Sequence, residues 1–482
     1  MTTTPLQDAE GDPHHWLGTE SVNSRLGSFE FKGGYPTLEA ARALDELLLM
    51  NRAIEVYLQN VSGVSMFKFR KGLRDFGVRT SRQVAIWPGL MDARTLLLTA
   101  NSDTVYNITF LDLKADGPTV VELPPRMLGL FDDMWMRYIS DGGLAGPDRG
   151  QGGKYLLVPP GYEGEIPASG YFVCRSPTYG VWMLMRAVDP DPSAAAERSR
   201  QMRIYPLGNA TDAESTTFLE ASGKYVDTIH ADDYTFFDEL DALVQEEPAD
   251  AIDPLRRFYL ASIGIIKGQP FSPDADRRAL LAEAARVAAA TTRMVAFARP
   301  DPEAPVYPDR RWQWAFVGGS YLFDSQGYEN IDRRAAFAYS ATGNTPAMAS
   351  QAVGLGSQYM WTPRDAGGDF LQGDRCYRMR IPANPPVKDF WSVTVYDALS
   401  RSMIQTSQKF PAVSTYTKPE ANDDGSVDIY FGPEAPAGKQ ANWIQTLPGR
   451  GWFPILRFYG PLQPFFDKSW RAGDIELEPR HK

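Results

Sequence analysis

Histidine is scarce in this chain, and its scarcity restricts the chemistry that the protein can perform. Of the four histidines among 482 residues, His14 and His15 stand in a polar N-terminal stretch and His481 is next to last. Only His230 lies inside the expected folded region, so a site built from several histidines is excluded. We expect His230 to be a solvated residue near a helix start, with a catalytic or ligand role as the alternative.

Cysteine is equally rare. Cys174 and Cys376 lie far apart in the sequence, each inside an apolar, strand-like segment. Two cysteines make neither a disulfide framework nor a zinc site. We expect both to be buried free thiols, which behave as small hydrophobic side chains.

Long apolar runs and an excess of basic residues are also missing. No apolar run approaches the ~20 residues that span a bilayer, and the opening MTTTPLQDAEGDPHH lacks the basic start and apolar core of a secretory signal. The 49 Lys and Arg are outnumbered by 60 Asp and Glu, giving a formal net charge of −11, which argues against a nucleic-acid partner. We therefore expect a soluble, cytoplasmic protein with no membrane or nucleic-acid partner, and we leave a homo-oligomer open.

Standard cofactor motifs are absent too. The glycine-rich stretch at 140–154 fails as a phosphate-binding loop, because Asp148 stands where the loop needs glycine and Tyr155 where it needs Ser or Thr. The sequence contains no dinucleotide fingerprint, nucleophile elbow, HExxH motif or EF-hand loop. We predict no zinc, haem or nucleotide and assign no metal ligands. Carboxylate and carbonyl oxygens suit hard cations, so calcium or magnesium stays open.

What the chain does contain is a change of hydrophobic period along its length. Helical spacing and β-rich runs divide it into a flexible arm, a helical segment, a β-sandwich domain, a helical region and a second β domain. The expected bounds are 1–35, 36–82, 83–189, 190–345 and 346–475. Short strands separated by Gly and Pro are typical of antiparallel sandwiches.

The stretch ANSDTVYNITFLDL at 100–113 places polar side chains directly before an apolar strand. Period-two alternation puts Tyr106 on one face of that strand. The preceding Asn101, Asp103 and Thr104 form either a turn that starts the strand or the floor of a binding site. We predict Asp103 and Tyr106 as catalytic residues, and Asn101 and Thr104 as substrate-binding residues.

A second polar set lies in FDDMWMRYISD at 131–141. Burial of an aspartate is costly unless the carboxylate is paired. We therefore predict that Asp133 and Tyr138 share one hydrogen-bonded cluster with Asp103, joined by Arg137. Carboxylates in such a cluster suit general acid–base work or a hard cation. Asp133 and Tyr138 are accordingly candidate catalytic residues, and Arg137 is a candidate substrate-binding residue.

The C-terminal strands also combine aromatic with polar and charged side chains. In FWSVTVYD, alternation separates Trp391 and Asp397 from Tyr396, and the last strands carry Arg457 and Tyr459. Aromatic faces beside Asp and Arg suit stacking and hydrogen bonding to a polar organic ligand. All five are candidate substrate-binding residues; the alternative is an aromatic-rich core.

These segments resemble one known family. ANSDTVYN is similar to an Asn-Asn-Asp-Thr-Leu-Tyr-Ser signature, and GGKYLLVPPGYEGEIP, CRSPTYGVWMLMR, FWSVTVYD and NWIQTLPGRGWFPILRFYGP resemble its later blocks. Together they resemble the paired domain-of-unknown-function 1254 and 1214 proteins, over residues 35–475. The resemblance implies a mainly β fold, with an N-terminal immunoglobulin-like β-sandwich, a helical insert and a C-terminal jelly-roll β-sandwich. It implies no settled reaction, and Ser102 departs from the second Asn of the signature.

Three functions follow as hypotheses. The first is an enzyme, hydrolase- or lyase-like, that acts on a small polar organic molecule with carboxylate acid–base or oxygen-ligated metal chemistry. The second is a non-catalytic binding protein for a sugar-like or aromatic ligand. The third is a structural or interaction protein. A pocket with perturbed carboxylates favours the enzyme, an aromatic groove the binding protein, and a flat surface the third.

Overall fold

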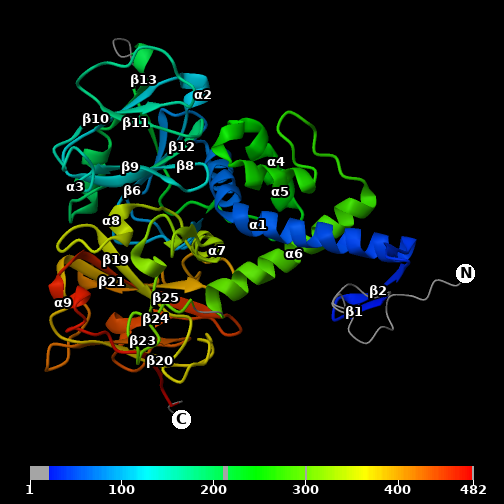
Figure 1. Ribbon diagram of the computed structural model, residues 1–482. Coiled ribbons are helices and arrows are strands. Elements are labelled where there is room, and N and C mark those ends of the chain that lie inside the picture. The colour runs from blue at the N-terminus through cyan, green and yellow to red at the C-terminus, as the bar shows by residue number, and fades with distance from the viewer. Residues whose placement is uncertain (1–20, 210–214, 299–300, 480–482) are drawn as a thin grey trace, which may run out of the picture.

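The computed structural model describes residues 21–209, 215–298 and 301–479 (Figure 1). Its strands form two β domains, which we call the N-terminal β domain (83–220) and the C-terminal β domain (313–477). The long helices lie beside both domains (Figure 1). The expectation of a mainly β protein is thus confirmed.

The N-terminal β domain contains two principal sheets. The six-stranded sheet has the order β14-β4-β6-β12-β8-β9. Its strands are β4 (Gln83–Ile86), β6 (Tyr106–Asp112), β8 (Met127–Asp133), β9 (Tyr138–Gly143), β12 (Gly180–Ala187) and β14 (Thr217–Glu220). The four-stranded sheet, of order β11-β10-β7-β13, has strands β7 (Thr119–Leu123), β10 (Gly153–Val158), β11 (Phe172–Arg175) and β13 (Arg203–Pro206).

The C-terminal β domain is built in the same way. Its five-stranded sheet, of order β16-β19-β25-β21-β22, has strands β16 (Gln313–Trp314), β19 (Ser357–Trp361), β21 (Val387–Asp397), β22 (Ala412–Ser414) and β25 (Trp452–Pro461). Its four-stranded sheet, of order β24-β23-β20-β26, has strands β20 (Tyr377–Ile381), β23 (Val427–Gly432), β24 (Trp443–Gln445) and β26 (Ile475–Leu477).

The helices and minor strands complete the chain. The helices are α1 (Leu38–Phe76), α2 (Leu113–Asp116), α3 (Pro192–Ser199), α4 (Thr235–Glu246), α5 (Pro254–Ser262), α6 (Ala275–Phe297), α7 (Ile331–Ser340), α8 (Pro346–Ala349) and α9 (Gln463–Phe466). The minor strands are β1 (Ser21–Ser24), β2 (Gly27–Lys32), β3 (Tyr35–Pro36), β5 (Thr95–Leu96), β15 (Val226–Asp227), β17 (Asp324–Ser325) and β18 (Tyr328–Glu329).

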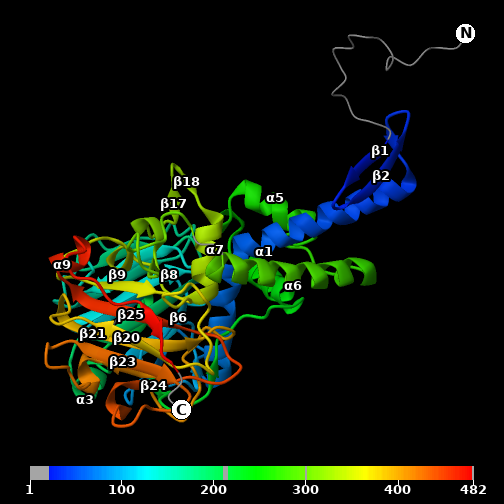
Figure 2. The same ribbon diagram turned by 90° about the horizontal axis from the view of Figure 1, so that it is seen from below.

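Two expected boundaries need correction. The strands β13 and β14 lie beyond residue 189, where the helical region was expected to begin, and they return to the sheets of the N-terminal β domain. β14 pairs in parallel with β4, a partner more than 130 residues earlier, and local periodicity carries no signal for such a pairing. Residues 1–20 of the expected flexible arm lie outside the described residues, but β1, β2 and β3 form a small antiparallel sheet at the outer end of α1 (Figure 2).

Helix α1 begins and ends where local signals place it. The Thr37 side chain accepts a hydrogen bond from the backbone N–H of Ala40, which caps the first turn. Gly77 follows the last residue with a φ of 126°, a conformation that favours glycine. The outer part of α1 and α6 extend away from the two β domains (Figure 2), while the inner part of α1 packs against them.

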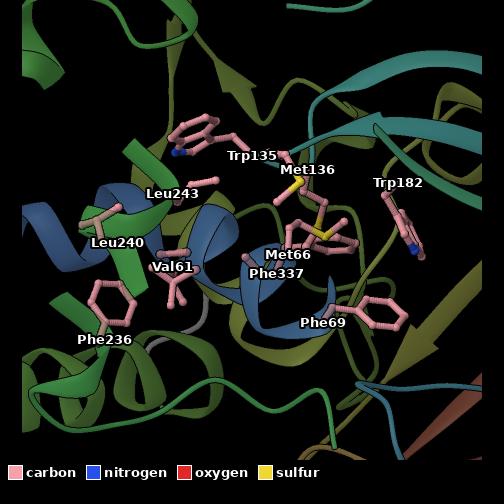
Figure 3. Packing of buried hydrophobic residues seen from close by; sticks show 14 of the residues in the cluster. Val61, Met66, Phe69, Trp135, Met136, Trp182, Phe236, Leu240, Leu243 and Phe337 are labelled. Atoms are coloured by element: carbon pink, nitrogen blue, oxygen red, sulfur yellow. The ribbon is translucent and has the colours of Figure 1, made fainter. Parts of the chain in front are cut away.

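One hydrophobic core joins these helices to both β domains. Phe69 of α1 packs against Trp182 of β12, with ring centroids 5.6 Å apart, and Phe337 of α7 belongs to the same core (Figure 3). Phe453 and Ile455 of β25 belong to it as well. The six-stranded and five-stranded sheets therefore each turn one face toward a shared interior, and this interface contains the candidate site.

Candidate functional site

The loop that precedes β6 docks directly onto the C-terminal β domain. The carbonyl of Thr99 accepts a hydrogen bond from Arg457 Nη2 at 2.5 Å, and the carbonyl of Ala100 accepts one from the Tyr396 hydroxyl. The two β domains therefore touch each other, rather than meeting only through the helical middle. The sequence stretch that resembles the family signature lies at this contact.

Thr99 adopts a backbone conformation that is unusual for its side chain. Its φ is 43°, in the left-handed region that β-branched residues rarely occupy. Its N–H donates to the carbonyl of Arg401 at 2.9 Å, and its own carbonyl binds Arg457. Such strain persists only when the surroundings impose it, and it clusters at functional sites.

Asn101 makes a turn before β6, the first of the two alternatives that the sequence left open. Its Oδ1 accepts hydrogen bonds from the backbone N–H of Asp103 at 2.9 Å and of Thr104 at 3.1 Å, and from the Thr104 hydroxyl. Its Nδ2 donates to the Tyr106 hydroxyl at 2.8 Å. The turn residue is thus Asn101 rather than Asp103, and the turn also orients Tyr106 within the interface.

The carboxylate of Asp103 is left for another role. Burial raises its pKa, and the nearby hydroxyls of Ser392 and Ser414 and the guanidinium of Arg457 oppose that rise. Its Oδ2 is inaccessible to solvent and makes no hydrogen bond of ordinary geometry with any described residue. Asp103 therefore reaches across to the C-terminal β domain instead of completing its own turn.

Strand register places the remaining site residues. On β25, Leu456 and Phe458 face the core of the C-terminal β domain, so alternation turns Arg457 and Tyr459 toward the interface. Arg457 pairs with Tyr359 of β19. On the opposite sheet, Tyr106 of β6 pairs with Arg186 of β12.

Arg186 and Arg457 bring two positive charges to this interface. Arg457 is 3% exposed, and Arg186 is half-buried because it borders a cavity. Their guanidinium groups lie over tyrosine rings: Arg186 at 5.3 Å from the centroid of Tyr459, and Arg457 at 5.5 Å from that of Tyr396. Neither forms an ion pair with any residue in the described ranges.

Both arginines stay charged at neutral pH, because a guanidinium group does not lose its proton in proteins. Burial raises the pKa of Tyr459, so its hydroxyl stays protonated as a hydrogen-bond donor. The site therefore combines fixed positive charge with neutral donors.

The buried polar side chains at this interface lie beside one another. The Asp103 carboxylate lies beside the hydroxyls of Ser392 and Ser414, and the Arg186 guanidinium lies beside the Tyr459 hydroxyl. The Tyr396 hydroxyl lies beside Thr394 and Arg457. A ligand that binds here would exchange these internal contacts for its own.

A cavity of about 70 Å³ adjoins Arg186. Tyr106, Tyr359 and Asp141 also line it. Asp141 of β9 is buried, and its Oδ1 accepts a hydrogen bond from the Thr345 hydroxyl. Burial raises the pKa of Asp141 to about 6, against the opposing effects of Thr345 and Tyr138. The cavity thus has an arginine on one side and a titratable carboxyl group on the other.

Asp133 does not join Asp103, contrary to the prediction of a shared cluster. Its carboxylate accepts the N–H groups of Trp135 at 2.7 Å and Arg137 at 2.9 Å, and it pairs with the Arg137 Nε at 2.5 Å. Asp133 and Arg137 therefore hold the turn between β8 and β9. Among the described residues Tyr138 bonds Asp141, accepting its backbone N–H at 3.0 Å, rather than Asp133.

Sheet register explains this separation. On β12, Val181 pairs with Asp133, whereas Arg186 pairs with Tyr106. Five residues of strand separate the two positions, about 17 Å at ~3.3 Å per residue. The two polar sets thus lie at opposite ends of the same sheet.

The C-terminal candidates divide in the same way. Tyr396, Arg457 and Tyr459 face the interface, but Trp391 packs into the core between the two sheets of the C-terminal β domain. Asp397 accepts the N–H groups of the following turn, at 2.8 and 3.0 Å. Trp391 and Asp397 therefore stabilise the domain and lie outside the interface cluster.

Sequence reasoning left Arg186, Tyr359, Ser392 and Asp141 out of the candidate set. Arg186 carried a usable signal, since it is a charged residue in the otherwise apolar run GVWMLMR. The other three gain their place only through the contact between domains.

The buried histidine and the two cysteines lie outside the set of residues that line the cavity beside Arg186. His230 is buried rather than solvated, with its Nε2 3.4 Å from Arg401 Nη2, and burial together with Arg401 lowers its pKa to about 4. Cys174 is a buried free thiol as expected, whereas Cys376 is half-buried. Within the described ranges, no group of three or more His, Cys, Asp or Glu side chains is arranged to hold a metal ion. No helix described here is long and apolar enough to cross a membrane.

Comparison with known families now gives these two domains their context. Residues 82–206 match the model of a protein of unknown function, DUF1254, and residues 356–463 match that of a protein of unknown function, DUF1214. The chain therefore carries the two paired domains that its sequence resembles. Tyr106 and Arg186 lie in the first matched segment, and Arg457 and Tyr459 in the second, so the interface cluster lies between the two.

One solved structure shows a similar fold. The VPA0106 protein from Vibrio parahaemolyticus is similar with a TM-score of 0.54 and 20% identity, over 89% of this chain and 100% of that one. An uncharacterized protein from Burkholderia cenocepacia gives a TM-score of 0.39 and 13% identity, over 92% and 97% of the two chains. The first likeness shows a shared fold alone. No curated protein matches this chain.

Proposed function

We propose that this protein binds a small organic anion between its two β domains, with Arg186 and Arg457 recognising the negative charge. The observation that carries the proposal is the pair of arginines on facing sheets, charged and without an ion-pair partner among the described residues. Removing an ion from water costs several kcal/mol unless a counter-charge offsets it. Asp103 lies near both guanidinium groups, which oppose the rise of its pKa on burial, so one carboxyl group faces two positive charges.

The chemistry of the cluster fits a carboxylate or phosphate group. Guanidinium groups present several N–H donors in a plane that matches both anions. Arg457, which lies beside the Tyr396 hydroxyl, and Tyr459, which lies beside Arg186, carry donors that such a group can accept from. The adjoining cavity of about 70 Å³ accommodates a group of that size, because a water molecule needs only about 10–15 Å³.

Removing either arginine is expected to weaken anion binding. Arg186→Gln and Arg457→Gln should each lower the affinity for sulfate and for acetate by roughly 10- to 100-fold, since a hydrogen bond to a charged group contributes about 1.5–3 kcal/mol. Isothermal titration calorimetry measures this directly. Arg42→Gln is the matched control, because Arg42 is exposed on the outer part of α1 and the charge change is identical.

Two results of these titrations would contradict the proposed anion site. If Arg42→Gln weakens binding as much as the two site variants, net charge rather than the site attracts the anions. If the wild-type protein binds neither sulfate nor acetate, the proposal is wrong. Thermal melting of each variant separates lost binding from lost folding.

A second candidate function, favoured by Asp141, is an enzyme acting on the bound molecule. A general acid or base works best when its pKa lies near the working pH, and burial raises the pKa of Asp141 to about 6. Asp141 lines the same cavity as Arg186, so it takes the acid–base role that the sequence analysis assigned to Asp133. Hydrolysis or elimination on a small organic acid is the reaction class that this pairing supports.

Sulfate binding is expected to weaken as the pH rises from 5 to 7.5. Asp141 loses its proton in this interval and adds a negative charge to the cavity wall, whereas sulfate does not titrate. One added negative charge roughly 10 Å from a divalent sulfate, at an effective dielectric constant of ~20, corresponds to about 3 kcal/mol, or roughly a hundredfold loss of affinity once Asp141 is fully ionised. The measurement is a calorimetric titration at several pH values.

Asp141→Asn is the control for this pH dependence. It keeps the shape of the side chain and removes the titrating group, so its sulfate affinity should vary much less with pH. Parallel pH profiles for wild type and variant would show that another group titrates.

The finer expectations from the sequence remain proposals. We propose an immunoglobulin-like topology for the N-terminal β domain and a jelly roll for the C-terminal one. Each domain has two sheets with a shared buried core, which supports this assignment. Cytoplasmic location and a homo-oligomeric state likewise stay predictions.

A further inference from the structure

A second, larger cavity lies close to Arg186 and Arg457, which we call the arginine cluster. It has a volume of about 320 Å³, and its walls come from α6, α7 and the five-stranded sheet. Most of its lining is apolar, including Val295, Ala336, Phe337, Trp361 and Ile455. We call it the apolar chamber. Its volume falls at the lower end of the ~300–1,000 Å³ of small-molecule pockets.

The apolar chamber begins at the position of β25 that precedes Arg457 on the same face of the strand. Ile455 lines the chamber and precedes Arg457 by two residues, so both side chains point to the same face of β25, about 7 Å apart. Their partners on β19 repeat this step, since Trp361 pairs with Ile455 and Tyr359 with Arg457. This face of the sheet therefore leads from the chamber toward the Arg457 guanidinium.

Thr99 connects the two sites a second time. It lines the chamber, and its carbonyl accepts the hydrogen bond from Arg457 Nη2. The strained φ of 43° at Thr99 thus occurs at the boundary between apolar chamber and arginine cluster. This is the position where a ligand that occupies both would pass.

The positive charge in the chamber wall already has negatively charged partners within the protein. Arg333 pairs with Asp301 at 2.8 Å and with Glu303 at 3.1 Å. Its positive charge is therefore already offset. The buried positive charge nearest to the chamber along β25 is that of Arg457, which shares the Asp103 carboxyl group with Arg186.

We infer that the ligand is an amphipathic acid, with its carboxylate at Arg457 and Arg186 and its apolar body in the chamber. This inference rests on the proposed function and specifies the ligand class. The small cavity beside Arg186 holds a head group but no larger body. The apolar chamber supplies the volume and the apolar surface that the rest of such a molecule needs.

The test is a series of straight-chain carboxylates, from acetate through butyrate, hexanoate and octanoate, titrated below their micelle concentrations. Affinity should rise about three- to fourfold for each added CH₂, the factor for full burial of one methylene, until the chamber is filled. Arg457→Gln should weaken every member of the series by a similar factor. Calorimetry reports all of these values.

Filling the chamber provides an independent variant. Ala336→Phe places a ring among the lining residues, and it should lower the ratio of octanoate to acetate affinity about tenfold. Ala41→Phe, at an exposed position on the outer part of α1, is the matched control and should leave that ratio unchanged. The wild-type series stands even if Ala336→Phe fails to fold.

Each outcome separates the two claims. Arginine-dependent affinity that does not grow with chain length overturns the amphipathic ligand and leaves the proposed anion site standing. Octanoate binding that persists in Arg457→Gln makes the chamber a separate apolar site and also overturns the inference. Absence of binding for acetate and sulfate alike contradicts the proposed function itself.

Discussion

Asp141→Asn is expected to stabilise the folded protein by about 3 kcal/mol at pH 8 and to change its stability little at pH 4. Burial raises the pKa of Asp141 from 3.8 to about 6. A carboxyl group whose pKa is raised by folding contributes stability below its unfolded pKa and loses that contribution as the pH rises through its folded pKa. Two pH units at 1.36 kcal/mol each correspond to about 3 kcal/mol, and asparagine avoids this loss.

Urea unfolding at pH 4, 6 and 8 measures the effect. The difference between wild type and variant isolates Asp141, because His230 and Glu247, whose pKa values shift to about 4 and about 7, titrate in both proteins. Asp45→Asn, at an exposed position on α1, controls for the general loss of one negative charge. A stabilisation that is equal at all three pH values would contradict the assigned cause.

Trp182→Ala is expected to destabilise the protein by about 3–5 kcal/mol, the usual range for removing a large aromatic side chain from a core. Trp182 is fully buried, packs against Phe69 of α1 and lines the cavity beside Arg186 (Figure 3). Its loss therefore opens a void where the inner part of α1 meets the six-stranded sheet. Denaturant unfolding at constant pH gives the value.

Trp182→Phe is the companion variant, and it should cost only about 1–2 kcal/mol. The indole Nε1 makes no hydrogen bond within the described residues, so phenylalanine removes a polar group that gains nothing from burial. The remaining cost comes from the smaller volume of the ring. Equal losses for the two variants would show that the indole N–H has a partner, such as a bound water or ligand.

Part of the candidate site was predictable from local residue patterns. Alternation separated Tyr396 from Trp391 on one strand, and the polar stretch before Tyr106 identified Asn101 and Asp103 as unusual. The similarity of several segments to one known family indicated that two domains of unknown function occur together in this chain. Among the predicted residues, Asp103, Tyr106 and Tyr396 meet at the interface because all belong to segments that one domain turns toward the other.

The wrong predictions have a common cause. Asp133 was joined to Asp103 by residue type, but strand register places it opposite Val181, at the other end of the sheet from Tyr106. Trp391 was assigned to a ligand because it is aromatic, but its face of β21 is covered by the second sheet of its own domain. Register and the covering of a face depend on residues distant in sequence, so neither spacing nor composition reveals them.

The residue pattern was sufficient for the mainly β character of the protein, since that character follows from side-chain period. It did not reveal that Arg186 and Arg457 face each other, that Asp141 borders their cavity, or that the apolar chamber adjoins them. Alternation defines two faces of a strand without stating what covers each. That choice is made when two sheets pack together, and the candidate site exists only at that contact.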